Sequence, residues 1–369
     1  MTHSSWCRLD AIAGLAMAVL LILSIGPSRS ATTADQTPLV STFSIVAFDP
    51  ENGDLGVAVQ SKFPNVRPIV PWAKAGVGAV ATQSFAELDY GIRGLELMAG
   101  GATAAEALRI VLRTDPDREK RQVGIVDANG NAATWTGESC TSWAGAVIGR
   151  GAGDAPPSVI RGEDGGKGVV VTGKGYTAQG NILVSGETVA AMARAFEETE
   201  GELSDRLVAA LVAGGAAGGD QRGEQSAALL VVRAGAGYDG MDNYIDISVY
   251  DHRTPLAELE RLYRLNNLYF TQSRAENMIP VTAEIAREIQ AIWQKRGFYD
   301  GVIDGVAGID FQKMLVSYMG WENYDLRIAA VEAVDVAGGE VLVIDKEVLE
   351  DIRTVFEQGL WKPRLKRSR

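Results

Sequence analysis

Short apolar runs separated by glycine-rich turns dominate the chain between residues 42 and 252. Runs that are apolar on both faces are typical of strands covered on both sides. Asn52-Gly53 favours a tight hairpin turn between the first two runs, because both residues tolerate positive φ. "YIDISVYD" (244–251) alternates between apolar and polar residues and predicts an edge or half-exposed strand. The other predicted strands are 43–48, 55–60, 77–82, 122–127, 168–173 and 227–232.

Helical periodicity appears twice within this region. Residues 89–113 predict two short helices broken at Gly100-Gly101. Further on, "SGETVAAMARAFEE" (185–198) places its apolar residues on one face, with Ser185 as the expected N-cap, and 203–214 predicts another helix. Strands, two helices, strands, two helices and strands fit two packed sheets with helices outside. The predicted fold class is α+β, as a four-layer αββα sandwich.

A second, mainly helical pattern follows. Residues 254–267 predict a closing helix, and residues 267–280 resemble a linker. A small helical domain is expected over 281–361, and a basic tail over 362–369. Within the small domain, helices are predicted at 282–296, from 311 with Asp310 as the cap, and at 345–358 after a short strand.

The first thirty residues differ from the rest of the chain. "AIAGLAMAVLLILSIG" (11–26) precedes small residues, which predicts a signal peptide over 1–30 with cleavage after Ser30. An uncleaved membrane anchor is the alternative, but the run is shorter than the ~20 residues that a spanning helix needs. Residues 31–41 form a polar spacer. We therefore expect a secreted or periplasmic protein without a stable membrane span after processing.

Charge and rare residues exclude several classes of function. The formal net charge of −12 gives no electrostatic support for a nucleic-acid partner. After removal of the signal peptide, Cys140 has no partner for an intrachain disulfide, and we expect it to pack in the core. His252 is then the only histidine, which excludes a histidine-rich zinc site. We expect no metal and no cofactor, and a hydrolase would need a base other than imidazole.

Four polar residues near predicted turns are candidate site residues. Asn181, expected just before a strand and a capped helix, is a candidate oxyanion donor. Lys62, near the end of the second strand, is a candidate for lowering the pKa of a nucleophile. Asp220 and Arg222, in a glycine-rich loop before a strand, are candidates for contacts with a substrate. Each has a structural alternative, namely a turn asparagine, a surface lysine and a salt-bridged loop.

Seven segments together resemble one protein family. They are "TFSIVAFDPENGDLGVAVQSKF", "VPWAKAGVGAVATQS", "YGIRGLELMAGG", "GESCTSWAGAVIG", "QGNILVSGETV", "GGDQRGEQSAALLVV" and "DISVYDH". The set resembles the family named domain of unknown function 1028, which is grouped with the N-terminal nucleophile (Ntn) hydrolases, and covers residues 42–266. The resemblance implies the αββα sandwich, with Thr42 at the start of the first strand as the nucleophile.

The resemblance also implies a base for this nucleophile. In an Ntn hydrolase the α-amine of the first residue takes the proton of its own hydroxyl, so no histidine is needed. After cleavage behind Ser30, residues 31–41 still precede Thr42, and an amide-bonded Thr42 has no free amine. Activity therefore requires a second cut between Ser41 and Thr42, without which the domain is catalytically silent.

The small domain carries a second resemblance. "GFYDGVIDGVAG" (297–308) is similar to the turn motif of peptidoglycan-binding three-helix modules. Such a turn would hold Asp300 and Asp304 at the lip of a shallow groove, with Tyr299 and Trp321 available to stack on sugars. The alternative is a generic helical extension in which the aspartates bond turn amides and the aromatic residues fill the core.

Together these patterns indicate an exported Ntn-type amidohydrolase or peptidase-like protein targeted to the cell wall. Peptidoglycan, or a small amide or peptide substrate, is the expected partner, and a homo-oligomer stays open. The alternative is a catalytically silent Ntn-fold binding protein held at peptidoglycan. The sequence leaves open whether the protein is an enzyme and which substrate it takes. In the enzyme hypothesis, the catalytic residues are Thr42, Lys62 and Asn181, and the substrate contacts are Asp220 and Arg222.

Overall fold

The structure is a computed structural model that describes residues 42–150, 158–159 and 167–364. The predicted signal peptide (1–30) and spacer (31–41) lie outside the described residues, as do residues 365–369 of the predicted tail. Within the described residues, no helix is long and apolar enough to cross a membrane.

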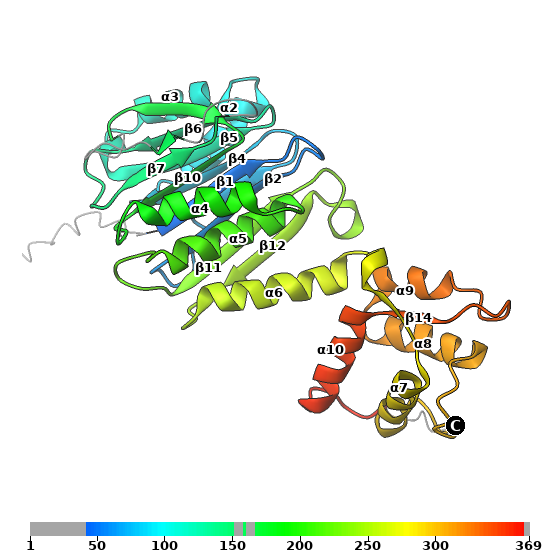
Figure 1. The fold of residues 1–369 in the computed structure, drawn as a ribbon. Helices are drawn as coiled ribbons and strands as arrows, with labels where there is room; N and C mark the ends of the chain where they lie inside the picture. Colours follow the sequence, from blue (N-terminus) through cyan, green and yellow to red (C-terminus); the bar gives the residue numbers. More distant parts are fainter. Residues whose placement is uncertain (1–41, 151–157, 160–166, 365–369) are drawn as a thin grey trace, which may run out of the picture. The chain divides into compact units, whose positions relative to one another are not determined.

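Two antiparallel sheets organise the described chain between Thr42 and Val249 (Figure 1). The larger sheet has the order β12-β11-β2-β1-β10-β7-β8, and the smaller has the order β3-β4-β5-β6-β9. The strands of the larger sheet are β1 (Thr42–Phe48), β2 (Leu55–Ser61), β7 (Gly145–Ile148), β8 (Ser158–Val159), β10 (Tyr176–Asn181), β11 (Ser226–Val232) and β12 (Asn243–Val249). Those of the smaller sheet are β3 (Pro71–Lys74), β4 (Gly78–Ser84), β5 (Arg121–Asp127), β6 (Asn131–Thr136) and β9 (Val170–Lys174).

Both faces of β1 are buried, and the two faces meet different partners. Phe43 and Ile45 belong to one apolar cluster with residues of the helices α4 (Glu187–Glu198) and α5 (Leu203–Ala216). Val46 points to the opposite face, where it joins residues of both sheets, such as Val57 of β2 and Val126 of β5. Successive side chains of a strand alternate between faces, so burial on both sides requires an unbroken apolar run. This confirms the predicted strands at 43–48 and 55–60.

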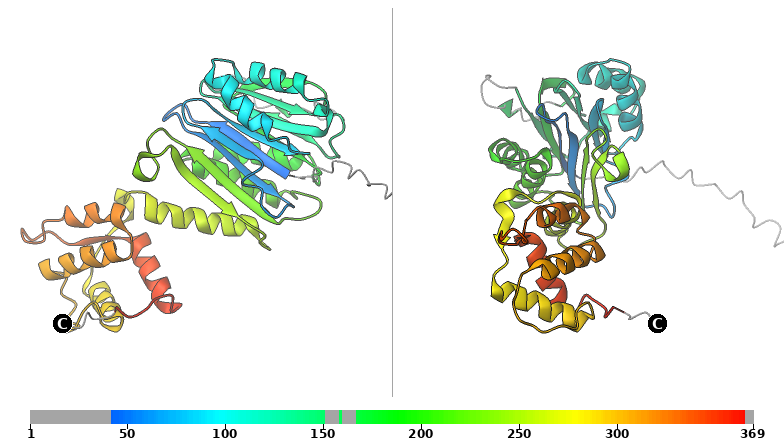
Figure 2. Two further views of the ribbon diagram at one scale, coloured as in Figure 1. Left: turned by 180° about the vertical axis from the view of Figure 1, so that it is seen from behind. Right: turned by 90° about the vertical axis from the view of Figure 1, so that its right-hand side faces the viewer.

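The smaller sheet is covered on its other face by α2 (Asp89–Ala99) and α3 (Ala104–Thr114), which share a core with β4, β5 and β6. Figure 2 shows these two helices and the pair α4 and α5 on different sheets. The predicted break at Gly100-Gly101 is confirmed, because α2 ends at Ala99 and α3 starts at Ala104. At the edge of the larger sheet, β12 alternates between exposed and buried residues, as predicted.

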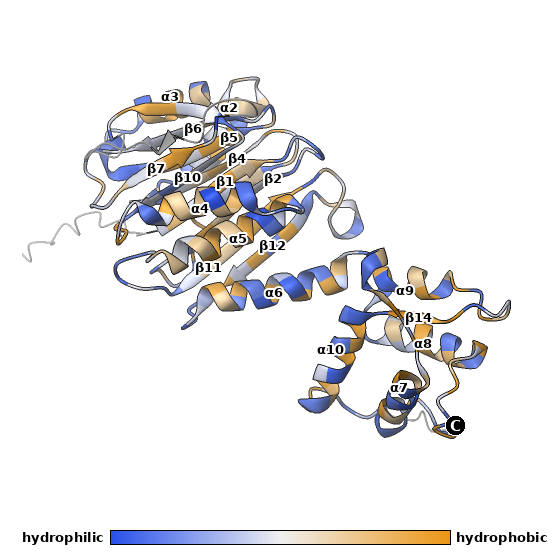
Figure 3. Ribbon diagram, viewed as in Figure 1, coloured by the Kyte–Doolittle hydropathy of each residue, from blue (hydrophilic) through white to orange (hydrophobic). Residues whose placement is uncertain are grey.

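The predicted N-cap of α4 is wrong by one residue. Gly186 holds the cap position, and the Ser185 hydroxyl accepts a hydrogen bond from the backbone N–H of Glu187 at 3.3 Å. A serine in this position still serves one of the unpaired amides of the first turn. Figure 3 shows both hydrophobic and hydrophilic colours along α4, as expected for a helix with one side on a sheet.

The C-terminal region is helical, with one short two-stranded sheet of β13 (Met278–Pro280) and β14 (Val343–Asp345). The predicted linker, 267–280, contains the end of α6 (Pro255–Phe270) and β13. The prediction that Asp310 caps its helix is wrong. Gly308 takes the cap position, and Asp310 lies in the first turn. The remaining helices are α7 (Ala283–Arg296), α8 (Ile309–Trp321), α9 (Asp325–Glu332) and α10 (Lys346–Glu357), and the short 3₁₀ turns are η1 (Arg118–Lys120), η2 (Tyr238–Gly240) and η3 (Ala275–Asn277).

Substitution of Gly124 of β5 tests how closely the two sheets pack. A Cβ at this position would lie 2.2 Å from Oε1 of Gln179 on β10, and Gln179 is held by hydrogen bonds to Ser44 and Thr177. We expect Gly124→Ala to lower the free energy of unfolding by about 1–3 kcal/mol, because the added methyl has to displace this side chain. Chemical denaturation measures the change.

The matched control is Gly94→Ala. Gly94 lies inside α2, where an added Cβ would meet its nearest atoms at 3.6 Å. Alanine also has the higher helix propensity, so the control should be neutral or slightly stabilising. Equal destabilisation by both substitutions would contradict the close sheet-to-sheet contact at Gly124.

Candidate functional site

Four polar side chains form a row across the central strands of the larger sheet. Thr42, the first residue of β1, lies opposite Asn181 of β10 on one side and Ser61 of β2 on the other. Ser61 in turn lies opposite Ser226 of β11. Residues that face each other across adjacent strands present their side chains on the same face of the sheet. All four are buried, and the Thr42 hydroxyl donates a hydrogen bond to the Ser61 hydroxyl at 3.0 Å.

Buried amide side chains from both sheets meet this row. Gln83 of β4 donates through Nε2 to the carbonyl oxygen of Thr42 at 3.3 Å and to Oε1 of Gln122 at 2.9 Å. Oε1 of Gln83 accepts a hydrogen bond from the Ser44 hydroxyl at 2.6 Å. That hydroxyl accepts one from Nε2 of Gln179, also at 2.6 Å. We call Ser44, Gln83, Gln122 and Gln179 the amide layer.

Gln122 of β5 is the most highly connected member of the amide layer. Its Nε2 donates to the Thr136 hydroxyl at 2.9 Å and to the carbonyl oxygen of Gly180 at 2.8 Å. Its Oε1 also accepts a hydrogen bond from Nδ2 of Asn181 at 3.0 Å. Gln122 therefore fixes the orientation of the Asn181 amide opposite Thr42. One N–H of Asn181 is used in this bond.

The prediction that Asn181 lies just before a strand is wrong. Asn181 is the last residue of β10, and the next residues, Ile182 and Leu183, pair with the loop that carries Asp220. Ile182 has a positive φ of 53°, which is uncommon for a β-branched residue. The backbone N–H of Gln221 donates to the carbonyl oxygen of Ile182 at 3.0 Å. The loop before β11 is thereby fixed at the end of β10, beside Asn181.

Lys62, Asp220 and Arg222 meet at the end of β2. The buried carboxylate of Asp220 accepts hydrogen bonds from the backbone N–H of Lys62 at 3.3 Å and from that of Arg222 at 2.8 Å. The Arg222 guanidinium forms an ion pair with the same carboxylate at 3.2 Å. The ammonium of Lys62 donates to the carbonyl oxygen of Glu224 at 3.4 Å. The salt-bridged loop, which was the structural alternative, is thus present, and both cations are solvent-exposed.

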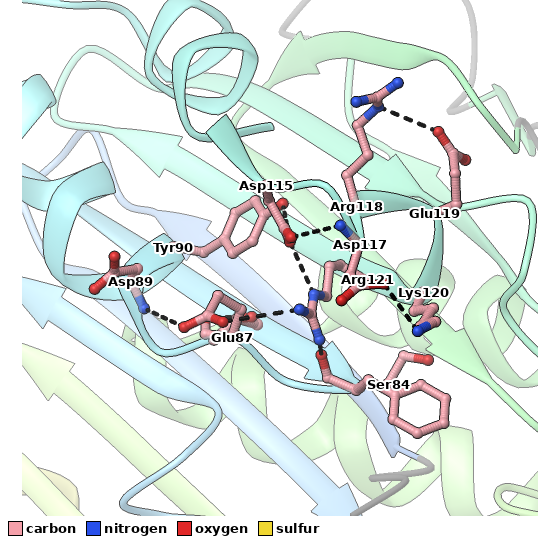
Figure 4. A network of polar contacts seen from close by, with 12 residues as sticks. Ser84, Glu87, Asp89, Tyr90, Asp115, Asp117, Arg118, Glu119, Lys120 and Arg121 are labelled. Carbon is pink, nitrogen blue, oxygen red and sulfur yellow. Dashed lines mark hydrogen bonds and ion pairs between the residues drawn. The ribbon is translucent and has the colours of Figure 1, made fainter. Parts of the chain in front are cut away.

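A second polar cluster lies on the helix-facing side of the smaller sheet (Figure 4). Nε of Arg121 donates to Asp115 at 2.8 Å, and the Tyr90 hydroxyl donates to the same carboxylate at 3.0 Å. Burial is the largest single effect on the pKa of Asp115 and acts to raise it. The hydrogen bonds from Arg121, from the backbone N–H of Asp117 and from Tyr90, together with the charge of Arg121, outweigh burial, so the pKa is lowered. Burial raises the pKa of Tyr90. The cluster therefore pairs a carboxylate, a cation and a neutral phenol, and it ties α2 and the end of α3 to β5.

Cys140 and His252, the rare residue types of the chain, both have hydrogen-bond partners in the backbone. Cys140 is buried, with its sulfur 3.3 Å from the carbonyl oxygen of Arg121, and burial raises the pKa of its thiol. His252 is exposed, and its Nδ1 accepts a hydrogen bond from the backbone N–H of Thr254 at 3.2 Å. Within the part of the chain that the structure describes, no three His, Cys, Asp or Glu side chains gather as a metal ion would require.

In the C-terminal region, the turn after α7 is held by Asp304. Its Oδ1 accepts hydrogen bonds from the backbone N–H of Val306 at 2.9 Å and from Nε2 of the buried Gln290 at 2.8 Å, and these bonds lower its pKa. The Tyr299 hydroxyl donates to the carbonyl oxygen of Val302 within the same turn at 2.8 Å. Asp304 therefore has the turn-stabilising role that was the alternative for it, while Asp300 is exposed.

Trp321, the last residue of α8, is 55% exposed. Its ring meets that of Phe298 edge to face, with 5.5 Å between the centroids. The structure thus gives Trp321 an aromatic neighbour that the sequence did not single out. The exposed surface of this turn also includes Val302 and Val306, which are 77% and 61% exposed.

Comparison with known families assigns the two regions. The model described as "Family of unknown function (DUF1028)" matches residues 42–153 and 160–259, more than half of the 369 residues. The chain therefore belongs to the DUF1028 family, which confirms the resemblance seen in the sequence. Residues 269–350 match a second model, described as "Putative peptidoglycan binding domain".

A solved structure supports the assignment. The crystal structure of protein SPO2555 from Silicibacter pomeroyi, which is described with the DUF1028 family, is 27% identical and superimposes with a TM-score of 0.50. The similarity covers 62% of this chain and 89% of that one. No curated protein matches the chain.

Gln122 provides a test of the amide layer. Gln122→Leu keeps the approximate size of the side chain but removes the acceptor of Gln83 and Asn181 and the donor to Gly180 and Thr136. Buried groups that lose their partner pay the cost of desolvation, so we expect a loss of about 1–3 kcal/mol in the free energy of unfolding. Urea denaturation measures it.

Gln60 is the matched control, because it is a buried glutamine of the larger sheet whose Nε2 has no hydrogen-bond partner among the described residues. Gln60→Leu should leave stability unchanged or raise it. If both leucine variants lose the same stability, the connections of Gln122 do not stabilise the fold.

Proposed function

We propose that residues 42–266 form an Ntn-hydrolase-like αββα sandwich that hydrolyses amide bonds with Thr42 as its nucleophile. The position of Thr42 carries this proposal. It opens the central strand of the larger sheet, between the two sheets, in a row with Asn181 and Ser61. The burial of apolar residues between the sheets and under both helix pairs supports the layering.

The chemistry requires a free amine on Thr42. After a cut between Ser41 and Thr42, the α-amine takes the proton of the Thr42 hydroxyl as Oγ1 attacks the carbonyl carbon of the substrate amide. Collapse of the tetrahedral intermediate breaks the C–N bond, and the amine leaving group receives the proton. Water then hydrolyses the ester on Thr42 and regenerates the hydroxyl. The ordinary pKa of an α-amine, about 7.7–8.0, suits this exchange near neutral pH.

The neighbouring residues receive roles in the same proposal. Asn181, oriented by Gln122, is the candidate donor to the developing oxyanion. Lys62 and Arg222 place positive charge at the end of the strand next to β1, and Arg222 is the candidate for contact with a substrate carboxylate. Asp220 acts as a positioning residue rather than a substrate contact, because its carboxylate is already bonded to the backbone of Lys62 and to Arg222.

The alternative function is a catalytically silent scaffold held at peptidoglycan. The burial of Thr42 favours it, because a side chain without exposed surface does not reach a substrate unless the end of the sheet is opened. The cut before Thr42 distinguishes the two functions, since it is needed for the enzyme and irrelevant for the scaffold. We also propose that residues 1–30 direct export and that the segment 281–361 attaches the protein to the cell wall. The match to a peptidoglycan-binding model supports the second of these proposals.

The proposed enzyme function predicts the mature N-terminus. Protein isolated from its native host should begin at Thr42, because only then is the α-amine free to act as a base. Intact-mass measurement and N-terminal sequencing decide the question. A single species beginning at Ala31 would favour the silent scaffold.

A substitution series tests the nucleophile. With a peptide-amide library as substrate, Thr42→Ala should abolish hydrolysis, and Thr42→Ser should retain part of it, because the hydroxyl and the amine both remain. Ser226→Ala, which changes a hydroxyl two strands away in the same row, is the control and should keep most of the activity. Full activity of the Thr42→Ala variant would remove this residue from the mechanism.

Binding to the cell wall is tested with the full chain and purified peptidoglycan. Trp321→Ala should weaken cosedimentation several-fold, because loss of one stacked aromatic ring costs about 1 kcal/mol or more. Tyr238→Ala, which removes a ring that is 82% exposed in the hairpin between β11 and β12, is the control and should bind like the unaltered protein. Equal binding by all three proteins would exclude Trp321 from the contact.

A further inference from the structure

The end of the described chain lies against two aromatic rings of the C-terminal region, the half-buried Phe298 and the exposed Trp321. The backbone N–H of Arg364 donates to the carbonyl oxygen of Arg296 at 2.8 Å, which fixes the chain beside the end of α7. The Arg364 guanidinium then lies over two rings, 5.1 Å from the centroid of Phe298 and 5.0 Å from that of Trp321. Arg364 itself is exposed.

The two rings are arranged to receive a cation. Phe298 and Trp321 meet edge to face, with an interplanar angle of 76°, so one cation contacts both. A guanidinium within about 6 Å of a ring centroid is attracted by the negative face of the ring. Arg296 lies 5.7 Å from the centroid of Phe298, but its guanidinium is paired with Glu322 at 2.8 Å and is almost fully buried. Arg364 is therefore the exchangeable cation of the pair.

We infer that Phe298 and Trp321 form a subsite for an organic cation, and that Arg364 occupies it until a ligand replaces it. The ligand class is an ammonium or guanidinium group presented by a peptide. Exchange of one cation for another conserves the attraction to the rings, and the exposed position of Arg364 makes the exchange sterically simple. Only the identity of the partner rests on the proposed wall attachment. That partner would be the free amines of the peptides in peptidoglycan.

Arg364 then acts as an internal competitor. A competitor in the same chain has a high effective concentration, so an external cation binds only weakly while Arg364 is present. Removal of Arg364 should improve binding by the strength of one exposed cation–π contact, about two- to fivefold. Lys362 offers a matched control, because it is an exposed cation of the same segment.

The first experiment needs no wall material. The full chain is labelled with ¹⁵N, and the indole N–H resonance of Trp321, assigned through Trp321→Phe, is followed during titration with arginine amide. Arg364→Ala should shift this resonance. In this variant, the concentration of arginine amide that is needed for a response should be about two- to fivefold lower than in the unaltered chain. Lys362→Ala should behave like the unaltered chain. A Trp321 resonance that neither moves on removal of Arg364 nor responds to arginine amide overturns the subsite.

The second experiment identifies the partner. Arg364→Ala should sediment with purified peptidoglycan at a lower concentration than the unaltered chain, and this gain should vanish when the free amines of the wall are acetylated. If neither protein sediments while the Trp321 resonance responds as described, the wall attachment fails and the cation subsite stands. If both proteins sediment equally and the resonance does not respond, the wall attachment stands and the subsite is wrong.

Discussion

The buried amide layer between the two sheets is the constraint on which the larger region depends. Apolar side chains tolerate small shifts, but a buried amide without a partner costs free energy. Gln122 takes its partners from both sheets, and Gln83 bonds to the backbone of Thr42. The distance between the sheets, the absence of a side chain at Gly124 and the position of Thr42 therefore have to agree with one another. The candidate nucleophile is held by the same contacts that join the sheets.

The C-terminal region has an apolar core of its own, and the turn after α7 is held by hydrogen bonds. Gln290 of α7 donates a hydrogen bond to the carboxylate of Asp304 and accepts one from the backbone N–H of Gly305, so hydrogen bonds join the turn to α7. The turn can therefore leave Val302 and Val306 exposed without losing its shape. A rigid turn with apolar residues and Trp321 on its surface suits recognition, because little conformational entropy is lost when a partner binds. This agrees with the match of residues 269–350 to a peptidoglycan-binding model.

The sequence predicted β1, β2, β11 and β12 of the larger sheet, because strands buried on both faces need apolar runs, such as 43–48, and an edge strand alternates. It missed β7, β8 and β10 of the same sheet. It predicted less of the site. Gln83 and Gln122 were missed because they lie at the boundaries of predicted strands, Gln83 just after 77–82 and Gln122 at the start of 122–127, where a polar residue gives no sign of a buried contact. Their shared signal was polarity at positions facing the other sheet, which requires knowledge of how the sheets pair. Asn181 was placed before a strand because β10 is rich in small and polar residues and lacks an apolar run.

The pairing of Thr42 with Asn181 and Ser61 has a consequence for folding accuracy. Strands that are buried on both faces can slip by two residues with little change in apolar burial, because every side chain keeps its face. Apolar burial alone would therefore distinguish poorly between the observed alignment of β1 and one shifted by two residues. Such a slip would, however, separate Ser44 from Gln83 and leave several buried amides without partners. The buried polar residues therefore select one register of β1, because only that register gives each of these groups its hydrogen-bond partner.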